Sequence, residues 1–596
     1  MATNMYFHLP QYFCFAVLFW TTCSHTSQAC RVDLPQGHVL GETIRFAYSG
    51  DPKVNTTLDV FKGIPYAEPP TGSNRFRRPI PKGNWDQWNA TRFNSICWQV
   101  PDVEPFIPPQ SEDCLYLNIW SPDVQRTNIP VMVWIHGGAF AVGSPRPLIY
   151  DGRPLSAYND IVVVSIQYRL NGFGFLTTGD EVLPGNYGLW DQQLALKWIK
   201  ENINAFGGDP ERITIFGQSA GGASVGFHLT QPSSWNYFNN AIMMSGSMLN
   251  PGAIQLNRSA AIESAFTIGR RTGCGWTTTS ETLAECLRTV NENQLALAID
   301  TALLKFEPTV DGDFITDAPQ TLVREGRFKP TPIMLGSTLN DGALATVFTY
   351  PDQIFKIRPT SDREDFRGRL RRVFTFANEL ILDAIEQQYI DWSQADDPEA
   401  NYFYTYMDLE SDETFLCTQE VVSREYHVRD HAVYRYLFTH KPSSSPWPPL
   451  PVWKGVAHGD DIGFVFGSAF LPEFENVTVT RKEVDLSFAM MTYFSNFAKT
   501  GNPNVGSNND TVDSPWMSYT LPSQTFKEFQ PGLPDINAYR SSYCAFWNRA
   551  LPDLITYKDH LTEAERNWRE DFMDWKYTSM KEWRKSNTEY DSELCK

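Results

Sequence analysis

Two continuous apolar runs mark the first half of the chain, "IPVMVWIHGG" at residues 129–138 and "DIVVVSIQYRL" at 160–170. Runs without polar alternation are typical of strands buried on both faces of a sheet. Apolar positions at helical spacing follow over residues 188–206, then a strand pattern at 212–216, and a helix is expected to begin near Ala220. This strand–helix–strand order predicts an α/β fold with a mostly parallel central sheet and helices on both faces.

The turn between that last strand and its helix reads "GQSAG", centred on Ser219. Glycines on either side of a serine permit the tight, strained turn that lifts a hydroxyl above the end of a sheet. A glycine-rich turn with an uninvolved serine is the alternative. Because strand, turn and helix follow in the required order, the pattern favours Ser219 as a nucleophile.

A nucleophilic serine needs hydrogen-bond donors for the oxyanion that its attack creates. The sequence "HGGAF", residues 136–140, directly follows the strand pattern at 129–135. We expect the oxyanion hole to consist of the backbone N–H groups of Gly138, Ala139 and Ala220.

In folds of this type an acid and a histidine follow the serine, in that order along the chain. The segment "PTPIMLGSTLNDGA" is a predicted strand followed by a polar turn that carries Asp341. Among the later histidines, His440 ends an apolar strand pattern and His458 lies in the loop "GVAHGDDIGFVFG". Spacing alone leaves His440 and His458 as equal candidates for the general base.

The composition narrows the class of protein and its compartment. A formal charge of −19 over 596 residues excludes nucleic acid as the expected partner, since phosphates would repel the chain. Residues 1–29 are predicted to be a secretory signal peptide, because a short apolar run precedes small residues that suit cleavage. We therefore expect a secreted, extracellular protein. It carries N-x-[ST] sequons for glycosylation at Asn55, Asn89, Asn257, Asn476 and Asn509.

The cysteines fit an oxidising compartment. Their spacing predicts two local disulfides, Cys97–Cys114 and Cys274–Cys286, and one long bridge, Cys417–Cys544. Cys30 stays unassigned, and Cys595 lies one residue from the end of the chain. No Cys-x-x-Cys pair or histidine-rich cluster predicts a metal site, and we expect no cofactor.

Several motifs together resemble the type-B carboxylesterases and cholinesterases of the α/β-hydrolase fold. They include "FKGIPYAEPPTGSNRFRRP", "SEDCLYLNIWSP", "FGGDPERITIFGQSAGGASVG" and "HGDDIGFVFG", spread over about residues 35 to 550. The resemblance implies Ser219 as nucleophile, Asp341 as acid and His458 as base, and the three disulfides named above. Most members of the family carry glutamate where this chain has Asp341. We divide the chain into an esterase domain at residues 30–555 and a tail at 556–596.

The tail is similar to the tryptophan-rich tetramerisation tail of vertebrate-type cholinesterases. Aromatic and apolar residues recur on one helical face, at Leu561, Trp568, Phe572, Trp575 and Trp583. An exposed stripe of this kind needs a partner, although a helix that packs back on its own domain is the alternative. We expect a homo-oligomer, a dimer or tetramer with an interchain disulfide at Cys595. The resemblance also implies a proline-rich anchoring protein, which would hold the enzyme at the cell surface.

The substrate pocket departs from the cholinesterase pattern. Choline is usually held by aromatic faces through cation–π attraction, and the loop closed by Cys97–Cys114 lacks the family's tryptophan. Trp98 and Phe106 are the aromatic side chains that could replace it. Gln218 stands where the family has glutamate, which removes a negative charge. The other positions that the resemblance assigns to the pocket are Gly252, Ala302 and Leu304 on the acyl side, Leu344 and Ala345 after the acid, and Tyr150 on the choline side.

This wider and less aromatic pocket favours a serine esterase that accepts a broad range of small-molecule esters. A cholinesterase with a rearranged cation site is the second hypothesis, since the tail and the disulfides resemble that lineage. A catalytically dead adhesion protein, similar to the neuroligins, is the third. Those proteins typically lose a member of the triad, whereas all three positions are filled here.

Overall fold

The computed structural model describes residues 28–48, 51–99, 109–299, 304–395, 397–443, 452–474, 479–559 and 563–594. The predicted signal peptide up to residue 27, together with Phe106, Ala302, Asn476, Leu561 and Cys595, lies outside these ranges. Gln28 and Ala29, the last two residues of the predicted signal, begin a strand that pairs with the neighbouring strand.

One large sheet organises the described residues, with strand order β1-β2-β3-β7-β9-β8-β10-β11-β12-β13-β14-β15 and β4 beside β2. Its parallel centre runs from β9 to β14, and antiparallel strands complete both edges, apart from the short β4, which pairs in parallel with β2. The central strands are β9 (Val162–Ile166), β8 (Ile129–Ile135), β10 (Gly208–Gln218), β11 (Asn240–Met244), β12 (Ile333–Thr338), β13 (Val433–Phe438) and β14 (Thr525–Phe529). The edges are β1 (Gln28–Leu34), β2 (Gly37–Tyr48), β3 (Asp51–Pro65), β4 (Gln87–Asn89), β7 (Tyr116–Ser121) and β15 (Asp535–Asn537).

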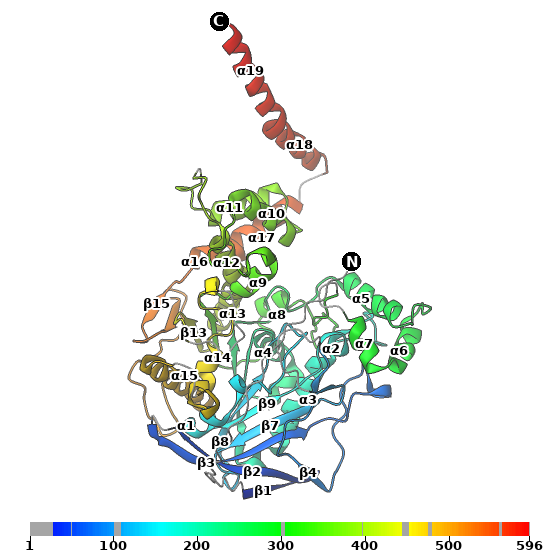
Figure 1. Cartoon of the computed structure of the whole chain (residues 1–596), viewed down its shortest axis with the longest axis vertical. Helices are drawn as coiled ribbons and strands as arrows, with labels where there is room; N and C mark the ends of the chain where they lie inside the picture. Colours follow the sequence, from blue (N-terminus) through cyan, green and yellow to red (C-terminus); the bar gives the residue numbers. More distant parts are fainter. Residues whose placement is uncertain are drawn as a thin grey trace, which may run out of the picture.

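Both faces of this sheet are covered by helices, as the continuous apolar runs predict. Along β8, Val131 and Val133 belong to one apolar cluster, whereas Met132 and Trp134 belong to another on the opposite face. The first cluster lies under α3 (Tyr187–Asn202) and α4 (Ala220–Thr230), and the second under α1 (Arg153–Asn159), α14 (Ile462–Phe466) and α15 (Arg481–Thr500) (Figure 1). The expected mostly parallel α/β architecture is confirmed.

Beyond the carboxyl end of the sheet, a group of helices surrounds a third apolar cluster (Figure 1). It consists of α9 (Ala343–Thr349), α10 (Arg363–Val373), α11 (Glu379–Tyr389), α12 (Phe403–Glu410) and α17 (Leu551–Asp559). The predicted tail boundary at residue 556 falls inside α17, whose residues Leu551 and Ile555 pack in this cluster. None of the helices in the described ranges is long and apolar enough to cross a membrane.

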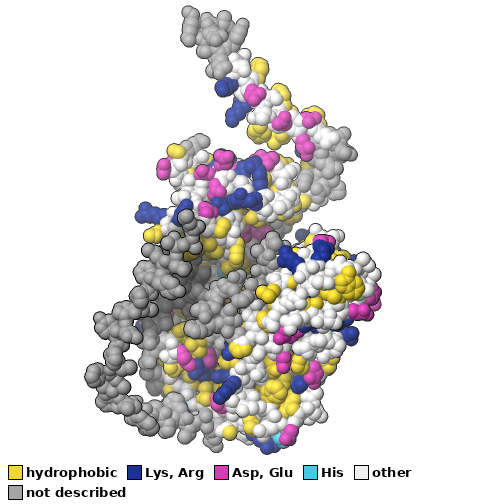
Figure 2. All heavy atoms as spheres, turned by 45° about the vertical axis from the view of Figure 1, so that its right-hand side comes forward, with side chains coloured by type: hydrophobic (Ala, Val, Ile, Leu, Met, Phe, Trp, Pro, Cys, Tyr) yellow, Lys and Arg dark blue, Asp and Glu magenta, His cyan; other side chains and the backbone are white. Residues whose placement is uncertain are grey.

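After α17 the chain forms a helix that projects away from the body (Figure 1). It comprises α18 (Glu563–Asp574), a π-helical turn at Trp575–Ser579 and α19 (Met580–Leu594). Its aromatic side chains are exposed to solvent, Trp568 by 64%, Trp575 by 51% and Trp583 by 64%. Figure 2 shows apolar side chains in yellow among charged ones on the projecting helix. The helix therefore does not bury its aromatic stripe against its own body.

Candidate active site

Ser219 occupies the turn between β10 and α4, with the backbone angles φ 59° and ψ −126°. A positive φ at a non-glycine residue is strained, by about 1–3 kcal/mol, and this turn is held by its neighbours. The Ser219 N–H donates to the Met244 carbonyl at 2.9 Å. A Cβ atom on Gly221 would lie 2.0 Å from the Ile135 carbonyl oxygen, so only glycine fits there.

Asp341 and His458 meet in this structure although 117 positions separate them in the chain. His458 Nδ1 lies 2.9 Å from Asp341 Oδ1, and the Asp341 side chain is fully buried. The carboxylate also accepts hydrogen bonds from the Thr338 N–H at 2.9 Å and the Thr338 hydroxyl at 2.8 Å. On the far side of the ring, His458 Nε2 is buried and has no hydrogen-bond partner within the described part of the chain. Nε2 is thus available to accept a proton.

Ser245 links the serine turn to the acid. It follows β11, the strand between β10 and β12, and its hydroxyl donates to Asp341 Oδ2 at 3.0 Å. The next residue, Gly246, lies so close to the turn that a Cβ atom on it would be 2.2 Å from the Ser219 carbonyl oxygen. The three neighbouring strands therefore bring Ser219, Ser245 and Asp341 together at their carboxyl ends, as expected for the ligand-binding edge of a parallel sheet.

The glycine loop after β8 lies directly against the serine. A Cβ atom on Gly137 would be 3.0 Å from Ser219 Cβ and 2.6 Å from the Gln218 carbonyl oxygen. The loop then turns through positive φ angles, 114° at Gly138 and 54° at Ala139, and its return is closed by the Val142 N–H, which donates to the Gly138 carbonyl. Gly137 therefore lies in contact with Ser219, and Gly138 and Ala139 follow it in the same turn.

His136 anchors the start of that loop. Its ring stacks on Tyr168 at a centroid distance of 4.5 Å, and the Tyr168 hydroxyl donates to the His136 carbonyl at 2.8 Å. Burial lowers the pKa of His136 to about 4, so the ring is neutral near neutral pH. A neutral ring adds no positive charge at the start of the glycine loop.

Gln99 ties the loop of the first disulfide to the glycine loop. Its amide oxygen accepts from the Gly143 N–H at 2.8 Å, and its amide nitrogen donates to the Gly143 carbonyl at 3.0 Å. The paired bonds fix the end of the glycine loop against the segment that begins at Cys97.

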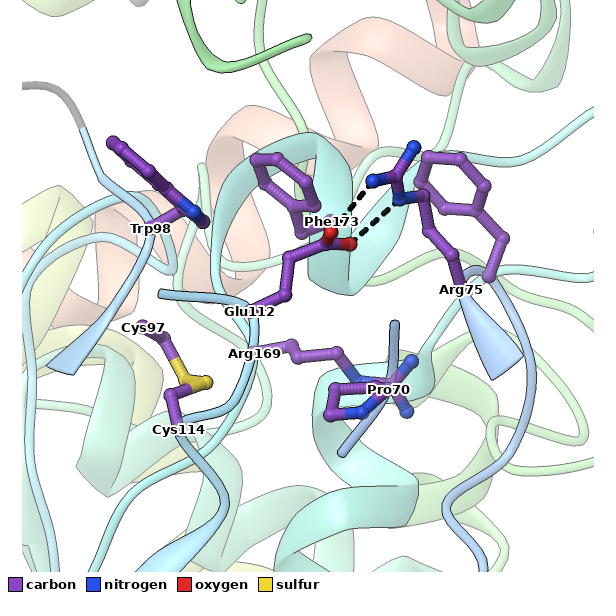
Figure 3. Close-up of a pocket in the computed structure, with 9 residues that line it drawn as sticks. Pro70, Arg75, Cys97, Trp98, Glu112, Cys114, Arg169 and Phe173 are labelled. Carbon is purple, nitrogen blue, oxygen red and sulfur yellow. Dashed lines mark hydrogen bonds and ion pairs between the residues drawn. A yellow bond between two sulfur atoms is a disulfide. The ribbon is translucent and has the colours of Figure 1, made fainter. Parts of the chain in front are cut away.

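The loop of the first disulfide is also held near Cys114, where Glu112 forms an ion pair (Figure 3). Two bonds of 2.6 Å join the Glu112 carboxylate to the guanidinium of Arg75, and both side chains are buried. Arg75 also donates to the carbonyls of Leu287 and Val290. Trp98 lines a small pocket together with Phe173 and the Cys97–Cys114 disulfide, and its indole N–H has no partner among the described residues.

Four residues that contact the site were not predicted from the sequence. Ser245 and Thr338 hydrogen-bond Asp341, Gln99 holds Gly143, and the Phe415 ring packs on His458 at a centroid distance of 4.8 Å. The positions of Ser245 and Thr338 at the ends of adjacent strand patterns are a signal for their location. Nothing in the sequence marks Phe415, which lies in a π-helical segment, Ser411–Leu416.

His440, the other candidate base, lies at the end of β13. Its Nε2 is 3.4 Å from Glu483 Oε1, and its ring packs on Phe464. Glu483 also accepts hydrogen bonds from Ser443 and Thr480, which contribute to lowering its pKa to about 2 even though burial opposes this. His440 Nε2 therefore approaches Glu483 without a hydrogen bond in the described part of the chain, whereas His458 Nδ1 is hydrogen-bonded to Asp341.

The predicted pocket residues are found at different depths. Gln218 and Tyr150 are buried, Leu304 is partly buried, and Leu344 on α9 is 43% exposed. The Gln218 amide nitrogen is buried without a partner among the described residues. Phe106 lies outside the described ranges, so the aromatic content of the first disulfide loop is represented here by Trp98 alone.

All three expected disulfides are present, Cys97–Cys114, Cys274–Cys286 and Cys417–Cys544. They fit an oxidising compartment. Cys30 is a free thiol, and burial together with the nearby Asp59 raises its pKa to about 12, so it is not activated. Four of the sequon asparagines are exposed, Asn55, Asn89, Asn257 and Asn509. Their glycosylation stays a prediction.

Comparisons with known proteins agree with this architecture. Residues 28–547 match the family model described as "Carboxylesterase family". The chain is 38% identical to acetylcholinesterase from Bungarus fasciatus over 547 residues, which is 88% of each chain. It is 36% identical to acetylcholinesterase from Danio rerio, over 86% of this chain and 88% of that one. It is 35% identical to cholinesterase from Mus musculus, over 96% of this chain and 94% of that one. The protein belongs to the carboxylesterase family and is a carboxylic ester hydrolase.

Proposed function

We propose that Ser219, His458 and Asp341 form the catalytic triad of this esterase. The observation that carries the proposal is the 2.9 Å contact between His458 Nδ1 and the buried Asp341, with Nε2 left available for the serine proton. Ser219 stands in the strained turn that exposes a nucleophile at the carboxyl edge of the sheet.

The reaction would take two steps. Ser219 Oγ attacks the ester carbonyl as His458 takes its proton, and the oxyanion is held by the N–H groups of Gly138, Ala139 and Ala220. His458 then gives the proton to the departing alcohol. Water hydrolyses the acyl-enzyme by the same route.

Labelling with an organophosphate tests the assignment of the nucleophile. One equivalent should attach to Ser219 in the native enzyme. Ser219→Ala should take up none and should lose about 10⁴-fold or more in kcat. Stoichiometric labelling of the Ser219→Ala variant would show that another residue is the nucleophile.

We further propose a broad ester specificity, centred on uncharged esters. Gln218 stands beside the nucleophile without the charge of a glutamate, and Leu344 presents an aliphatic side chain where the family pattern has an aromatic one. Neither contributes the negative charge or the aromatic face that holds a quaternary ammonium group.

Hydrolysis of choline esters is the second candidate, and the names of the relatives favour it, since they are called acetylcholinesterase and cholinesterase. Comparing kcat/KM for acetylthiocholine, butyrylthiocholine and a neutral aryl ester separates the two. Broad specificity predicts the highest value for the neutral ester. A strong preference for acetylthiocholine would overturn it.

Secretion and oligomerisation complete the proposal. The three disulfides and the sequons support an extracellular enzyme. The exposed aromatic stripe of the projecting helix supports self-association through the tail. The match to mouse cholinesterase spans 96% of this chain, so the unmatched residues are fewer than those of the tail, and at least part of the tail is included in the match. A homo-oligomer with an interchain disulfide at Cys595, able to bind a proline-rich anchor, is the form that we propose.

A further inference from the structure

A second exposed apolar surface lies beside the proposed active site. α9 begins two residues after Asp341 and presents Leu344 (43% exposed) and Phe348 (77%). The segment that follows presents Phe355 (97%) and Ile357 (79%). We call these four side chains, Leu344, Phe348, Phe355 and Ile357, the apolar rim. A cluster of exposed large apolar side chains marks an interaction surface.

The apolar rim is held in place by Gln353, which is buried. The Gln353 carbonyl accepts a hydrogen bond from the Trp453 indole N–H at 3.3 Å, and its side-chain oxygen accepts from the Thr360 N–H. Trp453 precedes His458 by five residues in the chain. The rim is therefore attached both to the loop that carries Asp341 and to the loop that carries His458.

Two cations alternate with the rim residues in the sequence Phe355-Lys356-Ile357-Arg358. Both are exposed, and neither Lys356 nor Arg358 takes part in an ion pair within the described ranges. Arginines on the neighbouring α10 behave differently, since Arg367 pairs with Glu379, Asp383 and Glu386. Within the described ranges, therefore, no ion pair neutralises the two cations that lie between the rim residues.

We propose that the apolar rim, with Lys356 and Arg358, docks on an anionic lipid surface. Apolar side chains that stand out from the body beside basic ones match the boundary between headgroups and acyl chains. The cations would meet lipid phosphates, while Phe355 and Ile357 enter the acyl region. A partner protein would need to supply a pocket around each protruding side chain, whereas a lipid surface deforms to admit them.

The net charge of −19 does not prevent this contact. Charges farther from the surface than a Debye length, about 8 Å at physiological ionic strength, are largely screened. The charges of Lys356 and Arg358 then dominate the electrostatic interaction with an anionic lipid surface. If Ser219 is the nucleophile, as proposed above, docking of the apolar rim would bring lipophilic esters dissolved in the lipid surface close to it.

Flotation of the full chain with lipid vesicles tests the proposal. Vesicles of phosphatidylcholine with phosphatidylserine should bind the protein, and vesicles of phosphatidylcholine alone should bind it less. The double variant Phe355→Ser/Ile357→Ser should lose about 100-fold in partitioning to anionic vesicles. Lys356→Gln/Arg358→Gln should lose about 10-fold to 30-fold on anionic vesicles and change little on neutral ones.

One matched variant locates the contact. Trp276→Ser removes an apolar side chain of similar exposure (68%) near the Cys274–Cys286 disulfide. It should bind vesicles like the native protein. Loss of binding in Trp276→Ser, retention in the Phe355→Ser/Ile357→Ser variant, or no binding by the native chain would overturn the proposal.

Two further measurements separate lipid binding by the apolar rim from self-association and from the proposed catalytic triad. Light scattering without vesicles should give the same mass for the native chain and for Phe355→Ser/Ile357→Ser. A smaller mass for the variant would show that a second copy of the chain, and not a lipid surface, covers the apolar rim. Ser219→Ala should bind vesicles as the native chain does. Failure of the proposed triad would thus leave the binding result intact, and failure of the rim would leave organophosphate labelling intact.

Discussion

The same kinds of aromatic residue have opposite surroundings in the body and in the projecting helix. Trp134, Phe216 and Phe466 pack on one another in the second apolar cluster, and all three are fully buried. In the tail, Trp568 stacks on Phe572 and otherwise faces solvent. The body has completed its contacts within one chain, whereas the tail has formed only those that neighbours on a single helix allow. Aromatic content alone therefore does not distinguish a core from an interface.

The π-helical turn at Trp575–Ser579 bears on the register of the tail. On a regular α-helix, the step of eight residues from Trp575 to Trp583 would rotate the second side chain about 80° away from the first. A π turn accommodates one extra residue, so the step behaves like one of seven residues, about 20° off the stripe. The structure thereby returns Trp583 toward the face of Trp575.

The largest difference between a substitution in the body and one in the tail is expected for kcat, on replacing the proposed acid, Asp341. Asp341→Asn keeps the size of the side chain but presents the wrong group to His458 Nδ1, and kcat should fall about 10³-fold to 10⁴-fold. Steady-state kinetics with a neutral aryl ester measure this, and the oligomeric mass should not change. An unimpaired variant would mean that the acid lies elsewhere.

A smaller effect in the body is expected at Ser245, a positioning residue that acts through Asp341. A hydrogen bond to a charged group contributes about 1.5–3 kcal/mol, so Ser245→Ala should lower kcat by about 10-fold to 100-fold. Ser245→Cys keeps a side chain of similar size with a weak donor and should keep more of the rate than Ser245→Ala. If the alanine and cysteine variants have equal rates, the hydrogen bond of residue 245 does not position the acid.

The body should also carry a pH dependence of stability. Burial lowers the pKa of His228 to about 3, so the folded state keeps this ring neutral while the unfolded chain protonates it below about pH 6.5. The free energy of unfolding should therefore fall as pH drops below about 6.5, by about 1.4 kcal/mol per pH unit for this group.

Urea unfolding with intact disulfides, between about pH 6.5 and about pH 5, measures that slope. His228→Gln should be less stable at neutral pH, since contacts with Ser234 and Gln192 change, but its slope should be shallower by one group. Trp276→Ser should keep the native slope. An unchanged slope in His228→Gln would show that other groups control acid unfolding.

The smallest kinetic effect is expected in the tail. Trp568→Ser/Trp575→Ser removes two exposed aromatic side chains that contact no part of the core clusters. The variant should shift to lower mass by light scattering, with kcat/KM per chain unchanged. If its mass equals that of the native protein, the stripe is not the oligomer contact.

Sequence reasoning recovered the elements that depend on local pattern. The runs at 129–138 and 160–170 become β8 and β9, and the helical pattern at 188–206 becomes α3 followed by a short 3-10 turn. Each run extends past its strand, because the residues after Ile135 and Ile166 belong to largely buried turns rather than to the ladder. The expected cysteine pairs are the observed disulfides, since their spacing restricted the choices.

The sequence by itself determined the parallel sheet, the turn that holds Ser219 and the order of serine, acid and histidine, because periodicity and glycine geometry act over a few neighbouring residues. Spacing left two histidines open, and only the family resemblance favoured His458 before the structure placed its ring on Asp341. Only the tertiary structure decided that Ser245 and Thr338 hydrogen-bond this acid, and that the segment with the apolar rim is bonded to the His458 loop. Those contacts join residues far apart in the chain, and they exist because adjacent strands end at one edge of the sheet. No local pattern records which loops that edge brings together.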